Sequence, residues 1–258
     1  MKLNRFILGV LTIFFAHAVH AQTQAGALTP AQQKIAWAQA GIKEDPGHTQ
    51  PYNDLAVAYV RRVRETGDVS YYEQAEVAAQ KSLQMSPDNL EGQKARILIL
   101  IGRKDFVRAL ELAKALNKKV PDDVLVYGFI ADADIELGNY KDAEEAAQWM
   151  LDMRPGNVPG LLRGARLRQI FGDAEGSMEF FSQAYQQTPP TQMEDQAWIL
   201  TQMGDLQLSI GKTDEARKLF RSALEKFPSY HLAAQSLTRA DAGVQHATEH
   251  LQTSSPVQ

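Results

Sequence analysis

Apolar positions recur along the chain at helical spacing, in pairs of short stretches separated by a break. The stretch 124–157 shows the pattern most clearly, with a first stripe of Tyr127, Ile130 and Ala131 and a second of Ala143, Ala147, Met150 and Leu151. Leu137, Gly138 and Asn139 separate the stripes, and Pro155 ends the second. Apolar residues three and four positions apart are typical of amphipathic helices, so this stretch predicts two helices joined by a turn.

Prolines give the pattern a fixed pitch. One series stands at intervals of 34 residues, namely Pro87, Pro121, Pro155 and Pro189, and the flanking Pro46 and Pro228 lie 41 and 39 residues away. A proline ends a helix because it lacks the backbone N–H and pushes the preceding residue out of the α region. A constant pitch of this length is typical of a solenoid in which two helices form each repeat.

Small residues also recur at fixed places in the repeat. Gly138, Gly172 and Gly211 fall between paired helices, and the second helices begin around Ala75, Ala109, Ala143, Ser177 and Ala216. Two helices that cross closely need small side chains at the contact. With Tyr52, Leu55, Ala56 and Tyr59 in the first repeat, the pattern resembles the tetratricopeptide repeat (TPR) family from Thr29 to about Gly243. The resemblance implies an all-α fold, a right-handed solenoid of antiparallel helix pairs.

The same resemblance divides the chain into segments. We expect a signal peptide at 1–21, a linker at 22–28, an N-terminal capping helix at 29–46, repeats at 47–89, 90–123, 124–157, 158–191 and 192–230, a C-terminal capping helix at 231–243 and a flexible tail at 244–258. Thr29 as N-cap and Pro30 at the first helical position favour a helix start there.

Two repeats exceed the pitch. Seven extra residues in the first repeat, about two helical turns, predict a projecting hairpin with one additional turn on each helix and a capping box from Ser70 to Glu73. Its tip would carry Arg61, Arg62 and Arg64, and a solvated charged tip is favoured over a partner-binding knob. A five-residue insertion, Thr191–Asp195, predicts a longer loop before the fifth repeat.

The N-terminal segment resembles a secretory signal. Lys2 and Arg5 precede an apolar run from Phe6 to Phe15, which is shorter than a typical membrane span, and small residues near Ala21 fit a cleavage site. We therefore expect a periplasmic or secreted protein with no stable membrane insertion after cleavage. The alternative is a protein anchored in the membrane by an uncleaved signal.

Charge and composition exclude several classes of function. Cleavage of the signal would remove Lys2 and Arg5 from the 27 basic residues. The remaining 25 stand against 31 acidic residues, which gives a net charge near −6. Nucleic-acid binding needs a basic face, so we expect no nucleic-acid partner. The chain contains no cysteine and therefore no disulfide or thiolate metal site. No feature indicates a cofactor.

Two short motifs resemble reactive sites without their structural context. His246, Glu249 and His250 have the H-x-x-E-H spacing of an inverted zinc-peptidase motif, but no following fold would supply a third ligand. Gly211-Lys212-Thr213 resembles the end of a phosphate loop, but Leu206 stands where a glycine is required. No Ser/His/Asp set has a recognisable context. We expect neither enzyme activity nor a metal site.

In TPR proteins the first helix of each repeat, helix A, lines a concave groove. One row of such positions contains Val57, Leu98, Asp132, Arg166, Asp205 and Arg239, and its alternating charges favour an internal ion-pair ladder over a set of ligand-binding charges. The other groove candidates are Asn53, Lys94, Leu125, Phe129, Arg163, Trp198, Gln202 and Leu232. Phe129 and Trp198 fit equally well as groove anchors and as inter-repeat core.

At two places the sequence departs from the pattern of the TPR family. Chaperone-binding TPR proteins grip a C-terminal carboxylate with Lys and Asn, but here Asn53 is accompanied by Val57 and Lys94 by Leu98, so that clamp is absent. Asp134 and Arg168 occupy equivalent positions in adjacent repeats, where the family has Tyr. Because a buried charge needs a partner, we expect these two side chains to pair.

The pattern as a whole predicts an exported TPR scaffold or adaptor that binds a protein or peptide in its concave groove. A binder of small molecules or cell-wall glycan in the same groove is the main alternative. An enzyme using the tail histidines and a structural role through self-association of terminal repeats are further alternatives.

Overall fold

The structure is a computed structural model that describes residues 28–253, with side chains placed as far as residue 242. The expected signal peptide lies outside this range. Twelve helices are described: α2 (Pro30–Glu44), α3 (Thr49–Thr66), α4 (Tyr71–Met85), α5 (Leu90–Gly102), α6 (Phe106–Asn117), α7 (Val124–Leu137), α8 (Tyr140–Met153), α9 (Val158–Ile170), α10 (Ala174–Gln187), α11 (Met193–Ser209), α12 (Thr213–Lys226) and α13 (His231–Thr253). Between residues 28 and 253, no helix combines the length and the apolarity needed to cross a membrane.

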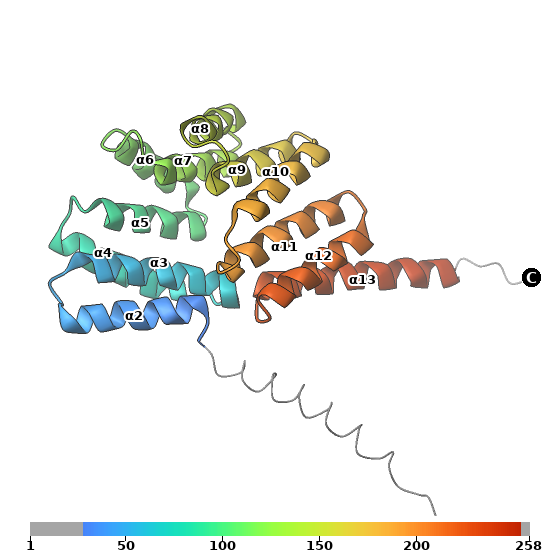
Figure 1. The fold of residues 1–258 in the computed structure, drawn as a ribbon, viewed down its shortest axis with the longest axis horizontal. Coiled ribbons are helices and arrows are strands. Elements are labelled where there is room, and N and C mark those ends of the chain that lie inside the picture. Colours follow the sequence, from blue (N-terminus) through green and yellow to red (C-terminus); the bar gives the residue numbers. More distant parts are fainter. Residues whose placement is uncertain (1–27, 254–258) are drawn as a thin grey trace, which may run out of the picture.

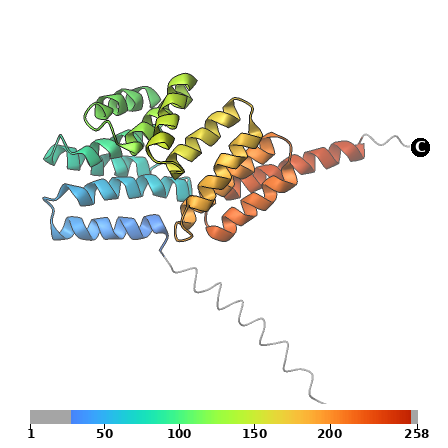
Figure 2. The same cartoon turned by 45° about the horizontal axis from the view of Figure 1, so that its top comes forward.

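The helices form five antiparallel pairs between two single helices. The pairs are α3–α4, α5–α6, α7–α8, α9–α10 and α11–α12, with α2 before them and α13 after them. In Figure 1 the chain curves from α2 through α7 and returns to α11, with α5, α7, α9 and α11 on the inner side of the arc. Figure 2 shows the same curvature from a second direction. The predicted TPR solenoid is confirmed, and we call the inner surface the concave face.

Polar side chains begin several of the helices, and the start predicted at Thr29 and Pro30 is confirmed. Thr29 caps α2, and its side chain and that of Gln32 exchange hydrogen bonds with each other's backbone N–H, which completes a capping box. Side-chain oxygens of Asn89, Asp105, Asp123, Asn157 and Asp173 accept N–H groups in the first turns of α5, α6, α7, α9 and α10. These contacts satisfy backbone donors that have no partner within a helix.

Small residues lie at the closest contacts between helices, as expected. Ala75, Ala109, Ala143, Ser177 and Ala216 have no exposed surface. In the fifth repeat, a Cβ atom added to Gly204 of α11 would lie 2.4 Å from Cε1 of Phe220 in α12. This glycine therefore permits the approach of the two helices.

The two insertions lengthen helices rather than loops. Helix α3 has 18 residues and α11 has 17, whereas α5, α7 and α9 have 13, 14 and 13. The predicted longer loop was wrong, because Met193 to Asp195 form the first turn of α11. The capping box at Ser70 was also wrong: this N-cap makes no side-chain cap hydrogen bond, and its own N–H donates to Asp68.

The C-terminal end differs from the expected tail. Helix α13 continues to Thr253, past the predicted helix end at Gly243, and extends away from the rest of the molecule (Figure 1). The motif of His246, Glu249 and His250 falls on this extension, outside the residues whose side chains are described.

Replacing Gly204 by Ala tests the close contact between α11 and α12. We expect Gly204→Ala to lower the free energy of unfolding by about 1–3 kcal/mol, because the added methyl group overlaps the Phe220 ring. Gly164→Ala is the matched control: its Cβ would lie 3.3 Å from Phe180, and the gain in helix propensity, about 1 kcal/mol, offsets the tighter contact. Urea unfolding measures both, and equal effects would contradict this view of the contact.

Candidate functional site

Acidic and basic side chains pair along the concave face between successive helices A. Asp132 of α7 pairs with Arg163 of α9, Glu136 with Arg166, and Asp205 of α11 with Arg239 of α13 at 2.6 Å. We call these six residues the charge ladder. A ladder was the favoured interpretation of this row. The Asp205–Arg239 pair follows the expected register, whereas Asp132 pairs with Arg163 instead of Arg166.

A glycine explains why Arg163 reaches Asp132. The Arg163 side chain lies across Gly128, where a Cβ atom would be only 3.1 Å from its Cζ. Its Nε donates to the carbonyl of Gly128 at 3.3 Å and its Nη1 to the carbonyl of Pro159 at 3.0 Å. The guanidinium is thus held by three oxygen acceptors, and Arg166, one turn further along α9, turns to Glu136.

Lys94 and Asn53 are engaged within the protein. The Lys94 ammonium lies 2.6 Å from Asp123 and 2.8 Å from Glu91. Burial alone would raise the pKa of Asp123, but hydrogen bonds from Lys94 and from the first turn of α7 lower it below its usual value. Asn53 is buried and donates to the side chain of Asn89. Both side chains therefore have partners within the protein.

The aromatic candidates lie in or against the core. Phe129 is 2% exposed and belongs to the core between the second and third repeats, so it is a core residue and not a groove anchor. Trp198 is half-buried and packs against the cores of the fourth and fifth repeats. Gln202 and Leu232 are also half-buried. Trp198 is therefore partly accessible to solvent, whereas Phe129 is not.

Apolar side chains remain exposed among the paired charges. Val57 on α3 is 39% exposed and Leu125 on α7 is 45% exposed. Leu125 also lines an open hollow of about 410 Å³ at the starts of α7 and α9, together with Asp122, Asp123, Val124, Arg154 and Pro159. The first helices of the repeats thus expose apolar side chains as well as paired charges, such as Arg166 at 45% and Arg239 at 58% side-chain exposure.

The expected pair between Asp134 and Arg168 was wrong. Asp134 is fully buried and accepts a hydrogen bond from Asn139 at 2.9 Å, with Lys114 of α6 at 3.9 Å. Arg168 is about half exposed and pairs with Asp173 at 2.7 Å. In each of these two repeats the residue at this position bonds across its own turn to the residue five positions later. The local partner is closer than the equivalent residue of the next repeat.

The extended end of α3 reaches the other end of the solenoid. Arg61 lies 2.8 Å from Glu194 and 2.7 Å from Asp195, and Arg64 lies 2.7 Å from Glu194 and 3.2 Å from Asp195. We call these four residues the clasp. The expectation of a solvated tip was wrong, because Glu194 is 1% exposed and the two arginines are about one-third exposed.

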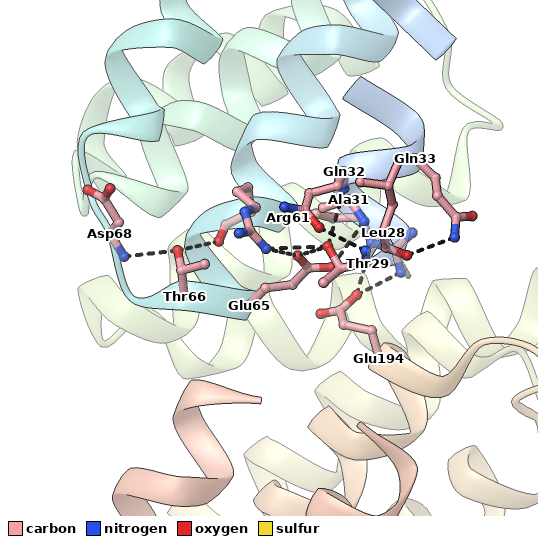
Figure 3. A network of polar contacts seen from close by, with 11 residues as sticks. Leu28, Thr29, Ala31, Gln32, Gln33, Arg61, Glu65, Thr66, Asp68 and Glu194 are labelled. Carbon is pink, nitrogen blue, oxygen red and sulfur yellow. Dashed lines mark hydrogen bonds and ion pairs between the residues drawn. The ribbon is translucent and has the colours of Figure 1, made fainter. Parts of the chain in front are cut away.

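A second network fixes the end of α3 to α2. Glu65, 2% exposed, accepts hydrogen bonds from the Thr29 hydroxyl at 2.6 Å, the Ala31 N–H at 3.0 Å and Arg62 at 2.7 Å. Figure 3 shows Glu65 and Thr29 in contact, with Arg61 and Glu194 beside them. The same turn of α3 is therefore held by α2 on one side and by α11 on the other.

Sequence reasoning missed Glu194 and Asp195 as partners of Arg61 and Arg64. A signal for this pairing is present in the sequence: the two segments that exceed the 34-residue pitch carry opposite charges, arginines in the first repeat and acids before the fifth. Among residues with described side chains, no group of three or more His, Cys, Asp or Glu is arranged to hold a metal ion.

Comparisons with known proteins agree on the fold. No protein-family model matches the chain, and no curated protein matches it significantly. Solved TPR structures do match. One is a thermophilic TPR protein of Thermus thermophilus, with a TM-score of 0.64 and 20% sequence identity over 75% of this chain and 98% of that one. Another is a TPR protein of Parabacteroides merdae, with a TM-score of 0.64 and 14% sequence identity over 91% of this chain and 86% of that one. The human IFIT1 dimer with m7Gppp-AAAA also matches, with a TM-score of 0.63 and 18% sequence identity over 80% of this chain and 49% of that one.

The clasp should contribute more to stability than an exposed pair of the ladder. We expect Glu194→Gln to lower the free energy of unfolding by about 1–3 kcal/mol, because it removes the more buried of the two carboxylates that pair with Arg61 and Arg64. Asp205→Asn, which breaks the more exposed pair with Arg239, should cost less than about 1 kcal/mol. In a double-mutant cycle with Arg64→Gln, zero coupling energy to Glu194 would contradict the contact.

The Lys94–Asp123 pair should make stability depend on pH. Because the folded-state pKa of Asp123 lies below its unfolded value near 3.8, its contribution is present above that pH and is lost as the pH falls through the folded pKa. Asp123→Asn keeps an N-cap but removes the charge. The stability gap between wild type and variant, measured by urea unfolding, should be largest near neutral pH and should shrink as the pH falls through the folded-state pKa of Asp123. A gap that is independent of pH would contradict the assignment, and Asp88→Asn controls for loss of an exposed carboxylate.

Proposed function

We propose that the chain is an exported scaffold that binds an extended segment of another protein along its concave face. The observation that carries this proposal is the combination of paired charges with exposed apolar side chains on the first helices of the repeats, which line the concave face in the TPR family. Charges that already have partners give little further binding energy, whereas Val57 and Leu125 gain from leaving water. The preferred segment is therefore rich in apolar residues and low in charge.

The charge balance favours a protein over a nucleic acid as the partner. The same fold in IFIT1 was solved with m7Gppp-AAAA, so the fold itself does not decide between them. Neutralising phosphates requires free Lys and Arg side chains. On the concave face of this chain, Lys94, Arg163, Arg166 and Arg239 each lie in an ion pair with a carboxylate. A bound strand would have to displace those carboxylates.

A small-molecule or glycan site in the same groove is the second candidate. It would be favoured by an enclosed pocket lined by aromatic rings, because sugars and small ligands are largely buried when bound. Phe129 is instead in the core, and Trp198 packs against two core clusters. The remaining exposed apolar residues stand on separate helices, which fits an extended ligand better than a compact one.

The periplasm or the cell exterior is the proposed location. Its support is the sequence of the first 21 residues, with Lys2 and Arg5 before the apolar run that ends at Phe15. The absence of cysteine is compatible with an oxidising compartment, where an unpaired thiol would be reactive. N-terminal sequencing of the exported protein tests the proposal: a start near Gln22 supports it, and a retained Met1 supports the anchored alternative.

Selection from a peptide library on the immobilised protein tests the proposed ligand class. We expect selected peptides to be apolar and weakly charged, and Val57→Lys with Leu125→Lys to weaken their binding at least roughly tenfold, because each lysine would have to be desolvated. The matched control, Val77→Lys with Val107→Lys, places the same changes on exposed residues of α4 and α6 and should bind normally. Equal losses in both variants, or selection of acidic peptides only, would contradict the proposal.

A further inference from the structure

The clasp joins parts of the chain that a solenoid normally keeps apart. In a solenoid each repeat contacts only its neighbours, yet Arg61 and Arg64 of the first repeat pair with Glu194 and Asp195 of the fifth. Helix α3 also contacts α13. A Cβ atom added to Gly67, just after α3, would lie 2.6 Å from Nε2 of His231 at the start of α13. Both views show the end of α3 beside the start of α11 (Figures 1 and 2).

Three of the four clasp residues, Arg64, Glu194 and Asp195, lie in segments that exceed the length of a regular repeat. Arg64 stands beyond the length of a 13- or 14-residue helix A, and Glu194 and Asp195 belong to the extra first turn of α11. Two independent elongations that meet with complementary charge indicate that closure is a specific feature of this chain. A regular TPR solenoid of the same number of repeats would lack both.

The contact is polar and is not continuous with a hydrophobic core. The core cluster of α3 contains residues of α2 to α5, and the cluster around Tyr230 contains residues of α10 to α13. No described core cluster includes residues of both α3 and α11. The clasp can therefore separate while each repeat keeps its own core. Only the last turn of α3, which lies past Val60 and outside that cluster, would lose its contact with α11.

Val57 links the clasp to the proposed binding surface. It lies four residues before Arg61 and seven before Arg64, so all three residues share one face of α3. Val57 is 39% exposed, and the clasp stands one turn further along the same helix. A ligand seated on Val57 would thus lie directly beside the contact that closes the concave face.

We propose that the clasp is a latch that controls access to the concave face. With the latch closed, the face admits a small molecule or an extended chain but excludes a folded domain. With the latch open, α11 to α13 move away from α3 and the face becomes accessible to bulky ligands. This inference rests on the proposed function in so far as the ligand binds there, but closure itself can be tested without any ligand.

The distance across the latch tests closure directly. Because the chain has no cysteine, Val69→Cys and Thr191→Cys, both at exposed positions, provide two unique sites for spin labels. We expect one narrow distance distribution in the otherwise wild-type chain. Glu194→Gln with Asp195→Asn should add a component at longer distance, at least roughly tenfold more populated than any such component in the wild-type chain. An unchanged distribution in a folded variant would overturn the latch.

A second pair of variants opens the latch without changing its charges. Gly67→Leu inserts a side chain where His231 approaches, whereas Gly138→Leu introduces the same strained left-handed residue where no atom lies within 4 Å. We expect a longer distance for Gly67→Leu only. Equal behaviour of the two would overturn the proposal, and the pair remains informative if the charge variant does not fold.

Chemical labelling tests whether the latch limits access. In a Val57→Cys chain, we expect N-ethylmaleimide to react quickly in closed and opened variants, and a maleimide on a bulky polyethylene glycol chain to react at least roughly tenfold faster in the opened ones. Val77→Cys on α4 should show no such difference. Equal access of the bulky reagent would refute control of access. Loss of peptide binding with an intact latch would refute the proposed function alone.

Discussion

The close approach of paired helices is the constraint on which the rest of the structure depends. Each pair buries little apolar surface by itself, so the chain becomes stable only when successive pairs stack. Stacking at this distance requires a small residue at every crossing, and the fully buried Ala75, Ala109, Ala143, Ser177 and Ala216 supply it. The regular 34-residue pitch follows from that geometry. Side chains outside these contacts are free to differ between repeats.

Closure through the clasp changes how such a molecule responds to stress. In an open solenoid, stability is approximately a sum over repeats and neighbouring interfaces. A destabilising substitution in one terminal repeat therefore has little effect on the stability of the other terminal repeat. Here Glu194 and Asp195 connect the fifth repeat to the first, and Glu65 connects the same turn of α3 to α2. The terminal parts of the chain should therefore stabilise one another, although most of the sequence lies between them.

The helix pairs could be predicted from the sequence because their causes are local. Prolines, caps and small residues act within one repeat, and Thr29 and Pro30 form the predicted helix start. The pairing of charges was harder, since it depends on distances between repeats. Asp134 found Asn139 five residues away instead of Arg168, and Arg163 reached Asp132 only because Gly128 leaves room. The clasp depends on the accumulated curvature of all five repeats, which no local pattern contains.

The concave face depends both on patterns within single repeats and on contacts between repeats that are distant in sequence. Its charges are paired along the charge ladder, so under the proposed function a ligand would bind mainly through exposed apolar residues such as Val57 and Leu125. Its accessibility depends on the clasp, which is distant in sequence but adjacent to Val57 on α3. A single helix, α3, thus contributes to the core of the first repeat, to the concave face and to closure.

Native-state amide hydrogen exchange tests the closed solenoid most directly. Phe220→Leu would weaken the core of the fifth repeat without touching the clasp residues. If the ends are coupled, the variant should lose protection not only in α11 and α12 but also at the amides of Val63 to Thr66 at the end of α3. Unchanged protection at the end of α3, with lost protection in α11 and α12, would show an open solenoid and contradict the account.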